Sequence, residues 1–299
     1  MHKYKEILQL GDDVAFIKIE HDDAMVTTVY QIIQPNTAPL ILKVCDSPLH
    51  AQNEVYFLNY FAEHISVPKV MGMVQACKEM RSAVLMEYVP GNVLTRSGIT
   101  KEIAFLIGTS LAKIHAHKTS GFGYLNRAQG LNSNPMVHFK EKFEEGIAEC
   151  TGHLPESTII KSMDYFNKAL HLLEKVDGPC IIHRDFRPGN MIIDQNTLSG
   201  IIDWSSARAS FAEDDFCAIE HNEWGDFKGY KRVFLDGYSR IRPIPNYHAI
   251  MPLLRLNRAI AVIGFTVKKR TWDNIHERIY TVNRQYIDIF DFVYTQPTP

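Results

Sequence analysis

A short stretch in the second half of the chain constrains its fold most: residues 182–190, which read Ile-His-Arg-Asp-Phe-Arg-Pro-Gly-Asn. An apolar run at 191–193 follows, then turn-forming residues at 195–200, then the segment Ile-Ile-Asp-Trp at 201–204. Two apolar runs separated by turn residues are typical of two antiparallel strands joined by a tight connection. The sequence therefore predicts a β-hairpin with polar residues at its open end.

Three polar side chains belong to that open end. Antiparallel pairing places the residue before the first strand, Asn190, beside the residue after the second strand, Asp203. Asp185 lies in the loop that leads into the hairpin. Phosphoryl transfer from ATP requires oxygen ligands for magnesium and a carboxylate that faces the attacking hydroxyl. We therefore expect Asp185 to accept the hydroxyl proton, and Asn190 and Asp203 to bind Mg²⁺.

The composition is that of an ordinary globular protein. The chain has 299 residues, of which 45% are hydrophobic and 22% charged, and its formal charge of -2 argues against nucleic-acid binding as the main activity. Its five cysteines show no paired spacing that would indicate zinc or a disulfide framework. The N-terminus lacks a long apolar run, and the apolar stretch 259–265 is too short to span a bilayer. We therefore expect a cytoplasmic protein without nucleic-acid or membrane partners, and its oligomeric state stays open.

The distribution of periodic segments predicts two lobes. Strand-like runs occupy 14–19, 25–33, 40–44 and 83–86, with a helix over 49–62. Helical patterns dominate after residue 90, at 103–114, 135–150, 158–176, 215–239 and 247–294. The fold class expected is α+β, with a small β-rich N-terminal nucleotide-binding lobe over 1–88 and a larger helical lobe over 89–299, which carries the catalytic loop and the acceptor site.

Lys43 lies within the apolar strand 40–44, where a lysine is unusual unless a partner holds it. We expect it to contact the nucleotide phosphates and to pair with Glu54 on the following helix, although Glu63 is an alternative partner. The linker residues Glu87, Tyr88 and Val89 are expected to bind the nucleotide base through their backbone groups.

Two acidic segments complicate this interpretation. The predicted turn at 20–25 contains no glycine and carries three acids, so it lacks the usual means of bringing backbone amides close to phosphate. The acids between 213 and 226 are consistent either with a negative pocket for a cationic substrate or with a solvated helix face. Asp215 is also a candidate structural anchor.

The segment from His183 to Asn190, followed by Asp203-Trp204, resembles the aminoglycoside phosphotransferase family, a small-molecule branch of the protein-kinase-like fold. The resemblance extends over roughly residues 15 to 290 and includes Leu-Ala-Lys-Ile-His at 111–115, Asp-Asp-Phe at 214–216 and Asp-Gly-Tyr at 236–238. No Ala-Pro-Glu segment follows Asp203, which disfavours a protein kinase.

The resemblance implies an ATP-dependent phosphotransferase that moves the γ-phosphoryl group to a hydroxyl of a small molecule, such as an aminoglycoside-like, amino-alcohol or sugar acceptor. The alternatives are a nucleotide-binding pseudokinase and, less favoured, a protein kinase. Arg184 stands where this branch commonly has glycine, and Arg187 where histidine or a lysine-like residue is common. These two arginines either favour an anionic acceptor or pair with neighbouring acids.

Overall fold

The computed structural model describes residues 1–19, 27–128, 130–222 and 230–295. The chain forms two compact units, each built from several segments. The first unit contains residues 1–116, 183–207 and 223–243. The second contains residues 117–182, 208–222 and 244–299. The mixed α/β class with an antiparallel N-terminal sheet and a helical C-terminal part is confirmed.

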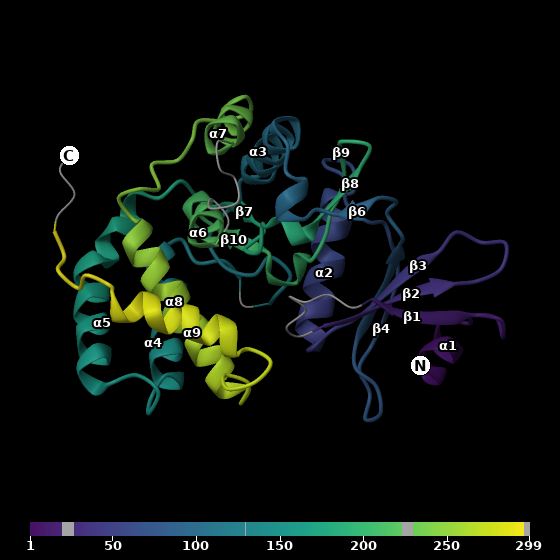
Figure 1. The fold of residues 1–299 in the computed structure, drawn as a ribbon, viewed down its shortest axis with the longest axis horizontal. Helices are drawn as coiled ribbons and strands as arrows, with labels where there is room; N and C mark the ends of the chain where they lie inside the picture. Colours follow the sequence, from purple (N-terminus) through teal and green to yellow (C-terminus); the bar gives the residue numbers. More distant parts are fainter. Residues whose placement is uncertain (20–26, 129, 223–229, 296–299) are drawn as a thin grey trace. The chain divides into compact units, whose positions relative to one another are not determined.

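A five-stranded antiparallel sheet occupies the N-terminal part of the first unit (Figure 1). Its strands, in spatial order, are β1 (Ala15–Ile19), β2 (Thr28–Ile33), β3 (Leu40–Val44), β5 (Ala83–Glu87) and β4 (Val70–Val74). The strands β1, β2, β3 and β5 were predicted, and the prediction is confirmed over the described residues. The strand β4 was not predicted. Its run of Val-Met-Gly-Met-Val is short and is interrupted by a glycine and by a register shift against β5.

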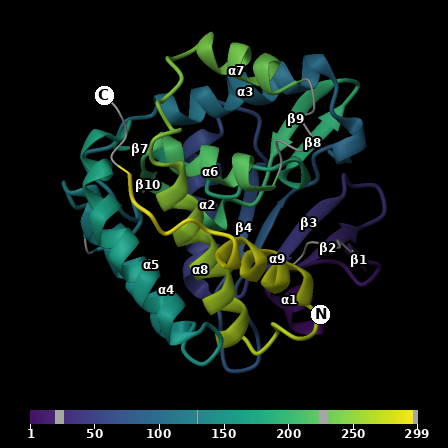
Figure 2. The ribbon, with the colours of Figure 1, turned by 60° about the vertical axis from the view of Figure 1, so that its left-hand side comes forward.

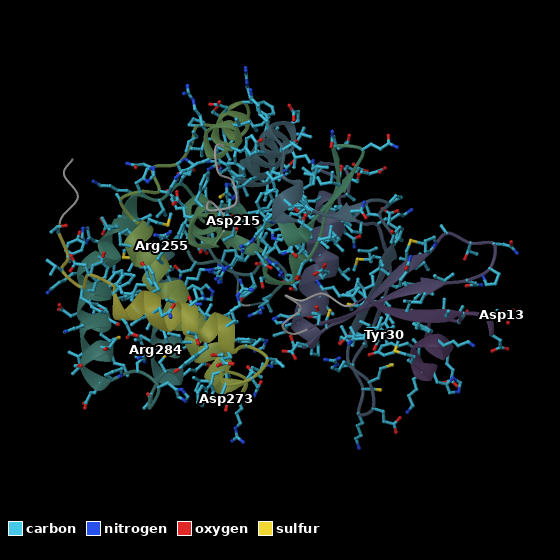
Figure 3. The ribbon with its side chains drawn as sticks, viewed as in Figure 1. Asp13, Tyr30, Asp215, Arg255, Asp273 and Arg284 are labelled. Atoms are coloured by element: carbon cyan, nitrogen blue, oxygen red, sulfur yellow. The ribbon has the colours of Figure 1, made fainter. Side chains whose placement is uncertain are left out.

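The two faces of this sheet differ in what covers them. One face packs on α1 (His2–Ile7), whose Tyr4 hydroxyl donates a hydrogen bond of 2.8 Å to the Arg81 carbonyl. Tyr30 belongs to this covered face and packs edge-on against Phe16, with ring centroids 6.5 Å apart (Figure 3). Because side chains alternate along a strand, Lys43 lies on the opposite face, where Ile17 is 49% exposed. On that second face Lys43 lies between Val29 and the fully buried Val84, and exposure increases towards the edge strand β1.

The helix α2 (Pro48–Phe61) follows β3 and begins with a side-chain cap. The Ser47 hydroxyl accepts a hydrogen bond of 3.2 Å from the His50 N–H, and Pro48 occupies the first turn, where its missing N–H costs nothing. The buried residues are Ala51, Asn53, Glu54, Phe57, Leu58 and Phe61. A buried asparagine and a buried glutamate within an apolar face indicate that this helix does more than fill the core.

The predicted hairpin is present in the first unit. Its strands are β8 (Met191–Asp194) and β9 (Thr197–Ile201), with β6 (Asn92–Val93) beside β8. The turn is shorter than the expected 195–200: only Gln195 and Asn196 form it, with φ of 46° and 64°. Two successive left-handed residues make a tight connection whose twist suits paired strands, so residues 197–200 are free to join β9.

Two glycines set the packing of α3 (Lys101–Ala116) on α7 (Lys231–Ser239) in the first unit. A methyl group at Gly108 would lie 2.0 Å from the Phe234 carbonyl oxygen, and one at Gly237 would lie 2.2 Å from the Phe105 carbonyl oxygen. Near this contact, the buried Tyr238 hydroxyl lies 2.8 Å from His115 Nδ1. The motifs at 111–115 and 236–238 therefore meet in one helix pair.

The second unit is mainly helical (Figure 2). Its elements are α4 (Pro135–Glu149), α5 (Glu156–Ala169), β7 (Cys180–Ile182), β10 (Arg208–Ser210), α6 (Ala212–Asn222), α8 (Met251–Lys268) and α9 (Glu277–Asp288). Short 3₁₀ turns, some in each unit, cover Arg96–Gly98, Leu170–Lys175, Pro188–Asn190 and Trp204–Ser206. The predicted segment 247–294 is two helices, because the chain turns through Arg270 at φ 56°. The apolar stretch 259–265 lies within α8, where Ala259, Ile260, Ile263 and Gly264 are buried.

A glycine substitution tests the close approach of α3 and α7. Gly108→Ala is expected to lower the free energy of unfolding by about 1–3 kcal/mol, because the added methyl group meets backbone that cannot move aside without opening the helix pair. Urea denaturation measures the change. Gly72→Ala is the matched control, since nothing lies within 4 Å of its added methyl group, and it should alter stability by less than about 0.5 kcal/mol. Equal losses in the two variants would contradict the packing described.

Candidate active site

A buried lysine joins β3, α2 and the end of β9 within the first unit. Lys43 Nζ lies 2.7 Å from Glu54 Oε2 and 2.7 Å from Asp203 Oδ1. Lys43 is 5% exposed and Glu54 is 1% exposed. Glu63 lies beyond the end of α2 and is exposed, so Glu54 is the partner of Lys43. A buried ammonium requires such partners, and here it has two.

The charge balance around Lys43 favours its protonated form. Burial by itself would lower the pKa of Lys43, but the adjacent carboxylates of Asp203 and Glu54 outweigh it and hold that pKa above its ordinary value. Burial also acts to raise the pKa of Asp203, yet the Lys43 ammonium and a hydrogen bond from Ser205 hold it well below its usual range. Asp203 is therefore an anion, as a metal ligand needs to be.

Asp185 and Asn190 contact each other directly. Asn190 Nδ2 donates hydrogen bonds of 2.7 Å to Asp185 Oδ2 and 2.8 Å to the Asp185 carbonyl oxygen. Arg187 Nε lies 3.2 Å from the same Oδ2. Of the two alternatives given for the arginines, an anionic acceptor or pairing with a neighbouring acid, Arg187 therefore follows the pairing. The Asp185 carboxylate is oriented by one amide and one guanidinium.

The backbone of the hairpin joins the Lys43–Asp203 ion pair to the Asp185–Asn190 pair. Met191 pairs with Ile201, and the Ile202 N–H donates a hydrogen bond of 3.0 Å to the Asn190 carbonyl oxygen. His183 Nε2 lies 3.1 Å from the Ile202 carbonyl oxygen, so this histidine connects the loop before Asp185 to the second strand of the hairpin. Asn190 and Asp203 therefore lie on adjoining positions at one end of the hairpin.

Two residues at this end have a left-handed backbone. Arg184 has φ 71°, and Asp203 has φ 65° and ψ 62°. A residue with a Cβ atom loses roughly 1–2 kcal/mol in this conformation, so the surroundings must hold it there. Glycine adopts positive φ without that cost. This geometry therefore explains why glycine is common at the position of Arg184 in the family that the sequence resembles.

The donor set fits Mg²⁺. Both hydrogen bonds of the Asn190 side chain use Nδ2, and the two bonds to the Asp203 carboxylate use Oδ1. Within the described residues, Asn190 Oδ1 and Asp203 Oδ2 therefore carry no hydrogen bond and remain available. An amide oxygen and a carboxylate oxygen are hard ligands of the kind that magnesium prefers.

The linker between β5 and β6 begins at Glu87, whose backbone and side chain both form hydrogen bonds with Lys69 beside the sheet. The Glu87 N–H donates to the Lys69 carbonyl oxygen at 2.9 Å, and Glu87 Oε1 accepts a hydrogen bond of 2.9 Å from the Lys69 N–H. The Glu87 N–H is therefore engaged within the sheet, and the next backbone N–H groups of the linker belong to Tyr88 and Val89. Val89 also packs on Gly200 of β9, where an added methyl group would lie 3.2 Å from Val89 Cγ1.

The acidic segments fall into two groups. The turn predicted at 20–25 lies outside the described residues, as do Glu223 and Asp226. The described acids of α6 have structural partners or are buried: Glu213 accepts hydrogen bonds from the Asp177 N–H, and Asp214 Oδ2 lies 3.3 Å from Arg208 Nη2. Asp215 is fully buried on α6 (Figure 3). These acids favour a structural role over a negative pocket.

Three side chains of α2 pack behind this site, and sequence reasoning missed two of them, Asn53 and Phe57. Asn53, Phe57 and Phe61 are spaced by four residues and so share one face of α2, which contacts the segment after Asp203. The sequence does contain a pattern that indicates this face: the polar Asn53 is followed by two aromatic residues, Phe57 and Phe61, at intervals of four.

A buried lysine–glutamate pair, a loop that carries Asp185 and a hairpin with two available hard oxygen atoms form an arrangement that is typical of a kinase-like phosphotransferase site. Residues 23–253, more than half of the chain, match the phosphotransferase enzyme family. The chain therefore belongs to this family, and the expectation of a small-molecule phosphotransferase with an alcohol group as acceptor is confirmed.

Solved structures of aminoglycoside phosphotransferases share the fold at low identity. A thermostable mutant of APH(4)-Ia, in a ternary complex with AMP-PNP and hygromycin B, superposes with a TM-score of 0.66 at 13% identity, covering 94% of this chain and 97% of that chain. ADP-bound APH(2'')-Ib gives 0.65 at 16% identity, covering 96% of each. Spectinomycin phosphotransferase APH(9)-Ia, with ADP and spectinomycin, gives 0.61 at 16%, covering 97% and 94%.

One sequence comparison and one search of the helices found nothing. No curated protein sequence matches this chain significantly. Within the described residues, no helix is both long enough and apolar enough to cross a membrane.

Removing the buried ammonium tests the charge balance. Lys43→Met is expected to lower the free energy of unfolding by about 3–5 kcal/mol, because it leaves the buried Glu54 carboxylate without its cation. Burial already raises the pKa of Glu54, and losing Lys43 raises it further. A group whose folded-state pKa is raised loses its stabilising contribution as pH increases, so the variant should become less stable as pH rises above about 4.3.

Denaturation of Lys43→Met across a pH series measures this. The double variant Lys43→Met/Glu54→Leu serves as control, since it removes the ammonium together with the buried Glu54 carboxylate, and it should recover much of the stability and lose the part of the pH dependence that comes from Glu54. A single variant whose stability loss is the same at every pH would contradict the charge balance described.

Proposed function

We propose that this protein transfers the γ-phosphoryl group of ATP to a hydroxyl of a small molecule in a Mg²⁺-dependent reaction. Residues 1–88 bind the nucleotide, and residues 89–299 supply the catalytic loop and the acceptor site. Lys43 contacts the phosphates and is held by Glu54, while the linker Glu87, Tyr88 and Val89 lies against the base. The side chains beside Lys43 in the sheet, Val29 and Val84, are apolar and suit a planar base.

The observation that carries the proposal is a continuous series of contacts in the first unit. Lys43 touches Asp203, the backbone of the hairpin joins Asp203 to Asn190, and Asn190 touches Asp185. Asn190 and Asp203 would hold the metal ion, which supplies charge neutralisation at the phosphates when bound. Asp185 orients the attacking hydroxyl through Oδ1 or Oδ2 and accepts its proton, while Arg187 and Asn190 fix the carboxylate in place.

The acceptor class rests on the family and on its solved members. The similar structures include enzymes bound to hygromycin B and to spectinomycin, which are polyhydroxylated small molecules, and nucleotide is present as AMP-PNP or ADP. We extend this to an aminoglycoside-like, amino-alcohol or sugar acceptor for this chain. The pairing of Arg187 with Asp185 and of the α6 acids with their own partners supports neither an anionic nor a cationic acceptor over the other.

The pseudokinase alternative is motivated by the glycine-free segment at 20–25. Asp185, Asn190 and Asp203 are all present, which favours activity, whereas a scaffold has no need of the three together. A screen of hydroxyl-bearing compounds by coupled ADP release decides between them. Acceptor-dependent ADP release supports the proposal. Tight AMP-PNP binding without release of ADP on any acceptor would favour the pseudokinase, and no nucleotide binding at all would contradict both.

Replacing the proposed base tests the assigned mechanism. Asp185→Asn is expected to lower kcat by about 10²–10⁴-fold, because the amide accepts no proton from the hydroxyl, while AMP-PNP affinity stays unchanged. Steady-state kinetics with an acceptor from the screen measure the effect. Asp273→Asn is the control, as this exposed carboxylate lies in the second unit (Figure 3) and should leave kcat unaltered. Full turnover by Asp185→Asn would refute the assignment.

A further inference from the structure

Asn53 is a buried polar side chain directed at the segment that follows Asp203. It lies on α2, is 3% exposed, and precedes Glu54 in sequence. Its Nδ2 lies 3.3 Å from the Trp204 carbonyl oxygen, 2.9 Å from that of Ser205 and 2.8 Å from that of Ala207. An amide nitrogen has two hydrogens, so three acceptors share two donors. One side chain thus gathers three carbonyl groups of a single short turn.

That turn begins directly at Asp203. The 3₁₀ turn Trp204–Ser206 starts one residue after the left-handed Asp203, and the Ser205 hydroxyl donates a hydrogen bond of 2.8 Å back to Asp203 Oδ1. A backbone in a left-handed conformation persists only where neighbouring contacts over-determine it. The contacts of Asn53 with the turn, together with the hydrogen bond from the Ser205 hydroxyl, supply that constraint on the C-terminal side of Asp203.

The N-terminal side of Asp203 is attached to the same part of the chain. The Ile201 N–H donates a hydrogen bond of 2.9 Å to the Ser66 carbonyl oxygen, in the loop just after α2. The ring of Trp204 packs on Phe57 and Phe61 of α2, with centroids 6.1 and 4.7 Å away. Stacking fixes the indole ring, and Asn53 engages the carbonyl groups of the turn from α2, while the Trp204 carbonyl oxygen also accepts a hydrogen bond of 3.0 Å from the Ala207 N–H. Asp203 is therefore flanked on both sides by contacts with α2 and its following loop.

We infer that Asn53 is a positioning residue for the metal ligand Asp203. By holding the turn 204–207, Asn53 fixes the left-handed backbone that presents the Asp203 carboxylate. Among the described residues its hydrogen-bond partners are backbone carbonyls alone, and its Oδ1 is buried without a hydrogen-bond partner. The inference rests on the proposed function, because it assumes that Asp203 binds Mg²⁺ beside the nucleotide phosphates.

The test compares Asn53→Leu with a matched buried asparagine. Asn283 on α9 is 5% exposed, donates one hydrogen bond of 2.7 Å to the Ile279 carbonyl oxygen, and also has a buried Oδ1 without a partner among the described residues. It belongs to the second unit, so Asn283→Leu reports the cost of removing a buried amide far along the chain from Asp203. Leucine has a similar size to asparagine in both cases.

The measured quantity is the factor by which saturating Mn²⁺ tightens the binding of AMP-PNP, obtained by calorimetric titration with Mn²⁺ and with EDTA. In Asn53→Leu this factor should fall about tenfold or more, as expected when a group supporting a metal ligand is removed, while metal-free AMP-PNP affinity stays within about twofold. Asn283→Leu should keep the factor of the unsubstituted protein. Equal factors in Asn53→Leu and the unsubstituted protein would overturn the inference.

The remaining outcomes separate the inference from the proposed function. If the unsubstituted protein binds no AMP-PNP, or binds it without any effect of Mn²⁺, the proposed metal role fails and the inference fails with it. If Asn53→Leu does not fold, Asn53→Ser takes its place, since a hydroxyl has a single hydrogen and is too short to reach three carbonyl groups. A tenfold fall in the factor for Asn53→Ser supports the inference, and an unchanged factor overturns it.

Discussion

The Lys43 ammonium group, buried between two carboxylates, is the interaction on which the rest of the site depends. It joins residues 11 positions apart on β3 and α2, and residues 160 positions apart on β3 and the end of β9. Taking three charges out of water is costly, and the cost is offset only where the geometry is close and each charge has a partner. The distances of 2.7 Å meet that condition. As a result, these ion pairs fix the sheet, the helix and the hairpin relative to one another around Asp203.

The same contacts prepare the site for an anionic nucleotide. Lys43 remains protonated because two carboxylates face it, and Asp203 remains ionised because of Lys43. The Asn190 amide is turned by its two hydrogen bonds to Asp185, so that its oxygen is left for a metal ion. Each side chain in the series therefore sets the protonation state or the orientation of the next. Such preorganisation is what phosphoryl transfer demands of a protein, since there is little covalent chemistry for side chains to perform.

The sequence predicted local features of this site well, for a physical reason. The adjacency of Asn190 and Asp203 follows from strand pairing alone, and β3 was found over its whole length because an apolar run with one lysine is distinctive. Short strands such as β6, β7 and β10 have two or three residues and carry no periodic signal. The helix α1 was missed because it has only six residues and one buried side chain, Tyr4. Those elements are stabilised by tertiary contacts and not by their own propensity.

The contacts of Asn53 show where sequence reasoning reaches its limit. A single asparagine in a helix has no pattern that reveals partners about 150 positions away, and its role is visible only once the turn after Asp203 is folded against α2. The central claim is that the pair Asn190 and Asp203 forms the metal site beside the nucleotide. A crystal structure of the complex with AMP-PNP and Mg²⁺ tests it most directly. The account predicts Mg²⁺ coordinated by Asn190 Oδ1 and the Asp203 carboxylate, with Lys43 on the phosphates. A metal ion bound through neither residue would contradict it.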